Sequence, residues 1–104
     1  MTQENEKKIE VSIDKDLADL IPTYLENRRK DIANIRAALE QGDYETVRVL
    51  GHDMKGSGGG YGFEEITEFG RSIEQTAKNQ DPESIQKQVA DLLEYLDQVH
   101  VIYE

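Results

Sequence analysis

The residues best suited to chemistry lie in one stretch, LGHDMKGSGGGYGF, at positions 50–63. It places His52 and Lys55 one helical turn apart and then carries five glycines within the seven residues 56–62. A flexible linker would use such glycines, but it would not need the apolar periodicity that continues through them to Tyr61. The alternative is a helix whose surface is stripped of side chains around one reactive histidine.

Helical geometry favours that alternative. At about 100° per residue, Leu50, Met54 and Tyr61 lie about 160° to 200° away from His52. The apolar side of the helix is therefore opposite the histidine, and we expect the imidazole to point into solvent. The same periodicity predicts that the helix continues through the glycines to Tyr61.

The neighbours of His52 on this face are small or cationic. Arg48, Lys55, Gly56 and Gly59 all lie within about 60° of the histidine. We expect Gly56 and Gly59 to let the backbone of another protein approach the ring, and Arg48 either to contact that partner or to be a solvated charge.

The other glycines are not explained in this way. A glycine inside a helix costs about 1 kcal/mol relative to alanine, so the stretch needs a compensating gain in binding or in packing. Gly58 and Gly60 lie off the histidine face. Close helix packing and local flexibility both remain open for them.

Phosphoryl chemistry suits a histidine in this setting. The sequence places no general base, oxyanion donor or second metal ligand beside His52, but imidazole alone is a good nucleophile toward phosphorus. The phosphoramidate formed is anionic, and Lys55 would stabilise it. Metal and in-line positioning would have to come from a partner. Neither a Walker loop nor a dinucleotide fingerprint fits, because Lys55 precedes Gly56 and no glycine triplet has the required spacing.

Four amphipathic helices are predicted to position this stretch. The first begins at Pro22 and ends at Gly42, the second begins at Asp43, the third follows Gly62, and the fourth begins after Asp81. The fourth apolar stripe consists of Ile85, Val89, Leu92, Leu96, Val99 and Tyr103. Short connections between the helices predict an all-α, antiparallel up-down four-helix bundle.

Two further features concern the start of the bundle. A short helical segment, capped by Asp14 or Asp16, is expected to precede it within residues 11–20. Arg28 interrupts the first apolar stripe, so we expect it to reach solvent or to pair with a carboxylate on another helix.

Length, charge and composition limit the classes of function that fit this chain. A chain of 104 residues indicates one domain, which we place at residues 11–104 behind a flexible segment at 1–10. The net charge of −10 and the lack of a basic patch argue against nucleic acid. Cysteine is absent, and no apolar run could span a membrane. We expect a cytoplasmic monomer that holds no metal of its own.

The segment HDMKGSGGGYGFEEITEFGRSIE resembles the signature of the histidine-containing phosphotransfer (HPt) domain family. The signature has a His, a Lys and a Gly three and four residues later, a Gly ten residues after the His, an apolar residue at fourteen, and an apolar–Glu pair that closes the third helix. Gly51 departs from it, since alanine often precedes the histidine. The resemblance extends over about residues 14–103, and the matching positions are His52, Lys55, Gly56, Gly62, Ile66, Ile73 and Glu74.

The resemblance implies a phosphoryl carrier and not an enzyme. It implies that His52 accepts a phosphoryl group from a receiver-domain aspartyl phosphate or a hybrid histidine kinase, and passes it to another receiver, with Mg²⁺ held by the receiver. A non-catalytic helical module that binds a receiver or kinase is the alternative. His100, expected in the last turns of the final helix, is assigned a structural role.

Overall fold

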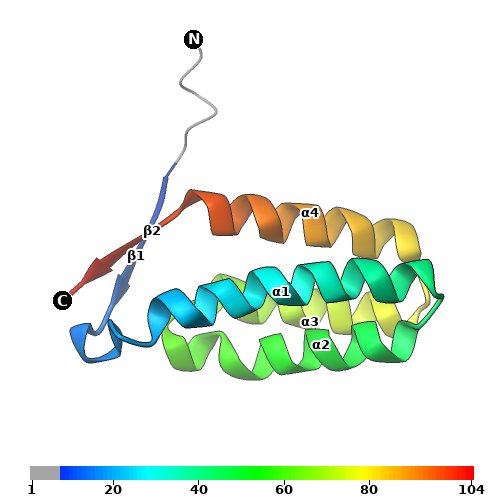
Figure 1. Ribbon diagram of the computed structural model, residues 1–104, viewed down its shortest axis with the longest axis horizontal. Helices are drawn as coiled ribbons and strands as arrows, with labels where there is room; N and C mark the ends of the chain where they lie inside the picture. The colour runs from blue at the N-terminus through cyan, green and yellow to red at the C-terminus, as the bar shows by residue number, and fades with distance from the viewer. Residues whose placement is uncertain (1–7) are drawn as a thin grey trace, which may run out of the picture.

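Four long helices dominate the computed structural model, which describes residues 8–104 (Figure 1). They alternate in direction, and the short connections make successive helices neighbours, as the sequence predicts. In chain order the elements are β1 (Ile9–Ile13), the 3₁₀ turn η2 (Lys15–Leu17), α1 (Ile21–Glu40), α2 (Tyr44–Ser57), the 3₁₀ turn η3 (Gly59–Tyr61), α3 (Glu64–Lys78), α4 (Pro82–Gln98) and β2 (Val99–Tyr103).

The predicted boundaries of the helices rest on local hydrogen bonds. Asp43 caps α2 by accepting the Thr46 N–H at 3.1 Å, and Asp81 caps α4 in the same way. Gly42 adopts a φ of +69°, a left-handed conformation that suits the turn after α1.

A two-stranded parallel sheet corrects the all-α prediction. β1 pairs with β2 in the register Ile9↔Val99 to Ile13↔Tyr103. The expected helical segment at residues 11–20 is reduced to η2, with Asp14 as its cap, and α4 stops at Gln98 instead of reaching Tyr103. Both strands are rich in β-branched residues, which favour extended backbone once a partner strand is available.

The flexible segment expected at residues 1–10 lies mostly outside the described residues. Its last part does not, because Ile9 and Glu10 belong to β1.

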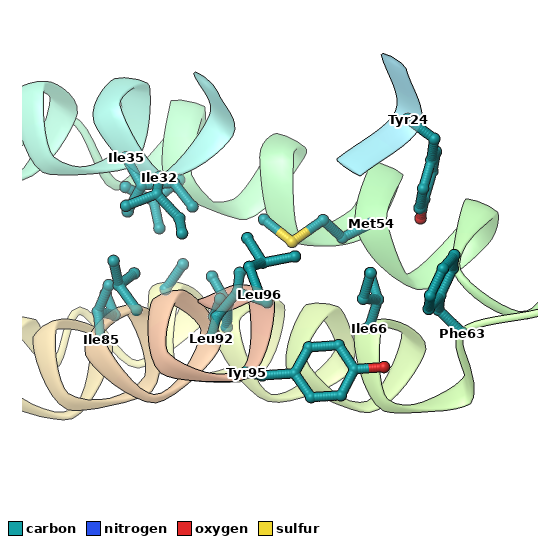
Figure 2. Close-up of a cluster of buried hydrophobic side chains, with 14 of the residues drawn as sticks. Tyr24, Ile32, Ile35, Met54, Phe63, Ile66, Ile85, Leu92, Tyr95 and Leu96 are labelled. Atoms are coloured by element: carbon teal, nitrogen blue, oxygen red, sulfur yellow. The ribbon is translucent and has the colours of Figure 1, made fainter. Parts of the chain in front are cut away.

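The core fills the space between the four helices, as their apolar stripes predict (Figure 2). Side chains from every helix contribute to this core. Burial raises the pKa of the core residue Tyr95 to about 12, and the nearby Glu65 carboxylate raises it further. The largest fully buried side chains are Phe63, Ile21, Ile35, Met54, Ile66, Ile73, Ile85, Leu92, Val47 and Val89.

The helices α2 and α3 approach so closely that only glycine fits where they cross. A Cβ atom on Gly70 would lie 2.6 Å from the carbonyl oxygen of Gly51 and 2.8 Å from the Cβ of Met54. A Cβ atom on Gly51 would lie 2.7 Å from the backbone nitrogen of Glu74. The two glycines therefore set the distance between the helices.

The glycine stretch ends α2 earlier than predicted. The Thr67 hydroxyl of α3 accepts the Gly59 N–H at 2.8 Å and donates to the Lys55 carbonyl at 3.3 Å, and so it replaces the helical bond between these two residues. A Cβ atom on Gly58 would lie 2.7 Å from this hydroxyl oxygen. Close packing is thus the use of Gly58, whereas a Cβ atom on Gly60 would meet nothing within 4 Å.

Aromatic stacking fixes the end of the glycine stretch against α1. The Tyr24 ring stacks on Tyr61 at 4.2 Å between centroids, and its hydroxyl lies 2.9 Å from the Ser57 hydroxyl. The guanidinium of Arg28 also lies over the Tyr24 ring, 4.5 Å from its centroid. Arg28 pairs with Asp31 of the same helix, at 2.8 Å, and not with a carboxylate of another helix, which was one of the two predicted alternatives.

Within residues 8–104, no helix is both long enough and apolar enough to cross a membrane.

The helix crossing yields a stability prediction. Gly70→Ala forces α2 and α3 apart, so we expect it to lower the free energy of unfolding by about 1–3 kcal/mol. Gly56→Ala is the matched control, because a Cβ atom there meets nothing within 4 Å, and it should stabilise the protein by up to about 1 kcal/mol. Chemical denaturation measures both. Equal stability of the two variants would contradict this account of the crossing.

Candidate functional site

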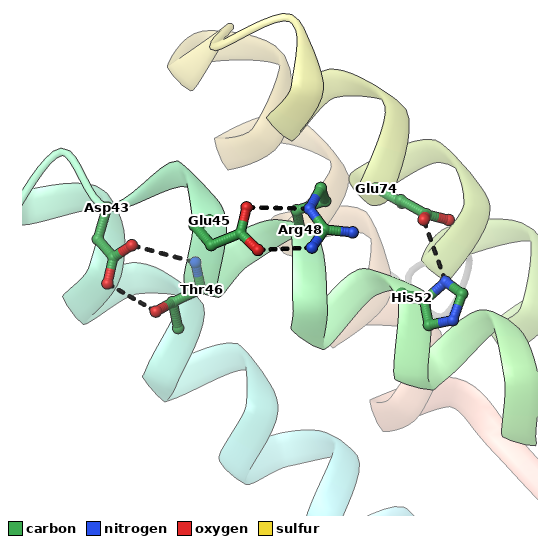
Figure 3. A network of polar contacts seen from close by, with 6 residues as sticks. All are labelled: Asp43, Glu45, Thr46, Arg48, His52 and Glu74. Carbon is green, nitrogen blue, oxygen red and sulfur yellow. Dashed lines mark hydrogen bonds and ion pairs between the residues drawn. The ribbon is translucent and has the colours of Figure 1, made fainter.

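His52 lies on the outward side of α2, with 59% of its side chain exposed. Its Nδ1 atom is 3.1 Å from Oε2 of Glu74 on α3 (Figure 3). The structure gives Nε2 no hydrogen-bond partner within residues 8–104. One ring nitrogen is thus held by the protein, and the other is available to a partner.

Glu74 connects His52 to Lys55. Its Oε1 atom lies 2.7 Å from the Lys55 ammonium, while its side chain is only 9% exposed. The hydrogen bond from Lys55 lowers the pKa of Glu74 most, the bond from His52 lowers it further, and burial opposes both. Glu74 is therefore an ionised carboxylate whose burial is compensated by two donors.

The helix crossing explains why Glu74 reaches the histidine. Gly51 directly precedes His52, and Glu74 follows Gly70 by one helical turn. Because the backbones are in contact at the two glycines, an acidic side chain on α3 extends to the exposed edge of α2. The same close contact between α2 and α3 brings the Lys55 ammonium to Oε1, the second carboxylate oxygen of Glu74.

We did not predict Glu74 as a site residue, and in the sequence it stands only as the end of the family signature. A signal was present, because Glu74 is a charged residue next to Ile73 on the stripe that α3 buries. The sequence did not indicate which residues of the facing helix α2 would pair with Glu74.

The bond to Glu74 decides which ring nitrogen carries the proton in the neutral imidazole. A carboxylate only accepts hydrogen bonds, so Nδ1 carries the proton when the imidazole is neutral. The lone pair then lies on Nε2, the nitrogen that faces solvent. The imidazole is thus oriented with its unprotonated nitrogen toward solvent.

The two predicted cations have local partners. Lys55 uses one of its three donors on Glu74, which leaves two for an incoming anion. Arg48 donates from Nε to Oε1 of Glu45 at 3.1 Å and forms no bond with His52 (Figure 3).

The two predicted contact glycines differ. Gly56 lies on α2 with open space around it. Gly59 lies in η3, beyond the end of the helix, so the angular offset expected from a continuous helix does not apply. A Cβ atom added to Gly59 would lie 3.2 Å from Oε2 of the Glu64 carboxylate.

The remaining candidate groups lie away from this network. His100 lies in β2 opposite Glu10, and not in the last turn of a helix as expected. Among residues 8–104, no three His, Cys, Asp or Glu side chains are grouped so that they could hold a metal ion.

Comparison with known proteins agrees with the geometry. The family model described as Hpt domain matches residues 19–101, which is most of the chain. No curated protein and no solved structure gives a significant match. The chain belongs to the Hpt domain family, whose members carry phosphoryl groups on histidine in phosphorelays and are not themselves catalysts.

Proposed function

We propose that His52 is the phosphoacceptor, that it takes the phosphoryl group from the aspartyl phosphate of a receiver domain, and that it passes this group to a second receiver. The observation that supports this assignment is the hydrogen bond that Nδ1 of His52 donates to Glu74, which leaves Nε2 exposed as the proposed nucleophile. A hybrid histidine kinase is the other possible donor. The proposal places the protein in the cytoplasm as a monomer.

The transfer step follows from the position of the proton. The Nε2 lone pair attacks phosphorus, a P–N bond forms, and the P–O bond to the aspartyl carboxylate breaks, so the receiver recovers its carboxylate. The Nδ1 proton stays in place, and the ring becomes a phosphorylated imidazolium. Glu74 then stabilises the new positive charge through the hydrogen bond that it already makes.

Lys55 has two parts in this proposal. Its bond to Glu74 holds the carboxylate in position, and its free N–H donors stabilise the phosphoryl oxygens. The receiver supplies Mg²⁺ and the in-line geometry that phosphoryl transfer needs. Arg48 and the bare backbone at Gly56 lie at the edge of the contact with the receiver.

The Glu74–His52 bond also favours transfer over mere binding. A helical module that only docks on a receiver or kinase has no need of a buried carboxylate that orients an exposed imidazole. A carrier needs such a carboxylate, because the same ring nitrogen must first accept the phosphoryl group and then pass it on.

Replacement of the acceptor tests the proposal directly. His52→Gln should abolish labelling by phosphorylated receivers and leave thermal unfolding nearly unchanged, because the ring is exposed and the amide of Gln can still donate a hydrogen bond to Glu74. His100→Gln is the matched control and should label like the unaltered protein. Labelling that survives in His52→Gln but is lost in His100→Gln would reverse the assignment.

Replacement of the carboxylate tests the network. Glu74→Gln keeps the size of the side chain but loses the charge opposite Lys55 and opposite the imidazolium, so transfer to His52 should slow. The folded-state pKa of Glu74 is lowered from 4.5, so its carboxylate contributes stability that is fully present above that value and is lost as pH falls.

The stability difference between the unaltered protein and Glu74→Gln should therefore be constant near pH 7 and shrink as the pH falls below about 4.5. Glu94→Gln, on the exposed side of α4, is the matched control. Unfolding measured across pH, together with transfer rates, checks both statements. A Glu74→Gln protein that transfers as fast as the Glu94→Gln protein would count against the network.

A further inference from the structure

Thr67 of α3 holds the backbone of Lys55, the cation beside His52. The Thr67 hydroxyl donates to the Lys55 carbonyl at 3.3 Å and accepts the Gly59 N–H at 2.8 Å. In a continuous helix this carbonyl would accept the Gly59 N–H directly. Lys55 is thus bonded to the neighbouring helix at a point where it would otherwise be bonded only to its own.

Two further contacts join Lys55 to the same side of α3. Its ammonium lies 2.7 Å from Oε1 of Glu74. A Cβ atom on Gly70 would overlap the Lys55 backbone nitrogen, so the two backbones are in contact there. Thr67, Gly70 and Glu74 are spaced by three and four residues, so they form one stripe along α3. A single helix face therefore contacts Lys55 at its carbonyl, its backbone nitrogen and the end of its side chain.

The local sequence explains why Lys55 needs this hold. Gly56 follows Lys55 directly, and residues 58–60 are all glycine. Glycine loses more conformational freedom on folding than any other residue, so a helix end made of glycines opens easily. Lys55 lies in the last turn of α2, where such opening would move its side chain.

We propose that Thr67 is a positioning residue for phosphoryl transfer, which fixes the end of α2 so that the Lys55 ammonium stays on Glu74 beside His52. The Thr67 hydroxyl bonds with backbone groups of Lys55 and Gly59 and forms no hydrogen bond with His52, so it acts through Lys55. The expected effect on transfer rests on the proposed function, whereas the hold on Lys55 is measurable without it.

Thr67→Val tests the hydroxyl, because valine keeps the shape of the side chain and loses both hydrogen bonds. With a receiver that labels the unaltered protein, the maximal rate of transfer should fall about tenfold, since displacement of a group by about 1 Å can slow a reaction by up to about a hundredfold. The half-saturating receiver concentration should change little. Thr67→Ser keeps a hydroxyl and should transfer at nearly the unaltered rate.

Thr76→Val is the matched control on the same helix. The Thr76 hydroxyl bonds with the Ser72 carbonyl at 2.9 Å and with Oε1 of Gln88 on α4 at 2.8 Å, so its loss disturbs α3 without reaching Lys55. Thr76→Val should transfer at the unaltered rate. If Thr76→Val or Thr67→Ser transfers as slowly as Thr67→Val, the role of the Thr67 hydroxyl is wrong.

A second readout does not depend on transfer. The hydrogen bond from Lys55 is the main cause of the lowered pKa of Glu74. If Thr67→Val releases Lys55, the pKa of Glu74, followed by NMR of its carboxyl carbon, should rise toward its ordinary value, and it should stay low in Thr67→Ser and Thr76→Val. An unchanged pKa of Glu74 in Thr67→Val would overturn the proposal. Thr67→Ala is measured in the same way if the valine variant does not fold.

Failure of the proposed function would give a different result. Phosphoramidate transfers its phosphoryl group to imidazole and releases ammonia, so it labels His52 without a receiver. Labelling of the unaltered protein by phosphoramidate but by no receiver would overturn the transfer between receivers. The pKa of Glu74 in Thr67→Val and Thr67→Ser would then still decide whether Thr67 positions Lys55.

Discussion

The contact between α2 and α3 at Gly51 and Gly70 is the constraint on which the rest of the site depends. It brings the two backbones closer than any side chain would allow. This approach lets Glu74 reach across to the exposed edge of α2, where it meets His52. A bundle with ordinary helix spacing would leave the imidazole without a partner and free to rotate.

A buried charge is acceptable here because it is shared. Glu74 accepts from Lys55 on one oxygen and from His52 on the other, so a carboxylate that is 9% exposed keeps its charge. In the proposed function, this charge lies where positive charge would develop when the ring is phosphorylated. In the proposed function, the network would orient the nucleophile before the reaction and stabilise the product after it.

The glycine stretch has three structural uses and is neither a linker nor a uniform helix. Gly51 permits the crossing, Gly58 packs under the Thr67 hydroxyl that ends α2, and Gly56 leaves the surface beside His52 bare. The stacked ring of Tyr24 then holds the turn that follows. The exposed His52, on a glycine-rich segment, is in this way supported by closely packed neighbours.

The sequence by itself determined the four helices, most of their ends and the outward direction of His52, because these depend on period, capping residues and turn chemistry that act within a few positions. Only the tertiary structure decided the rest. The strands form because Ile9–Ile13 and Val99–Tyr103 meet, α2 ends where Thr67 of another helix interrupts its hydrogen bonds, and Glu74 joins the site because two glycines far apart in the chain touch. Each of these is a contact between distant residues, which no local pattern contains.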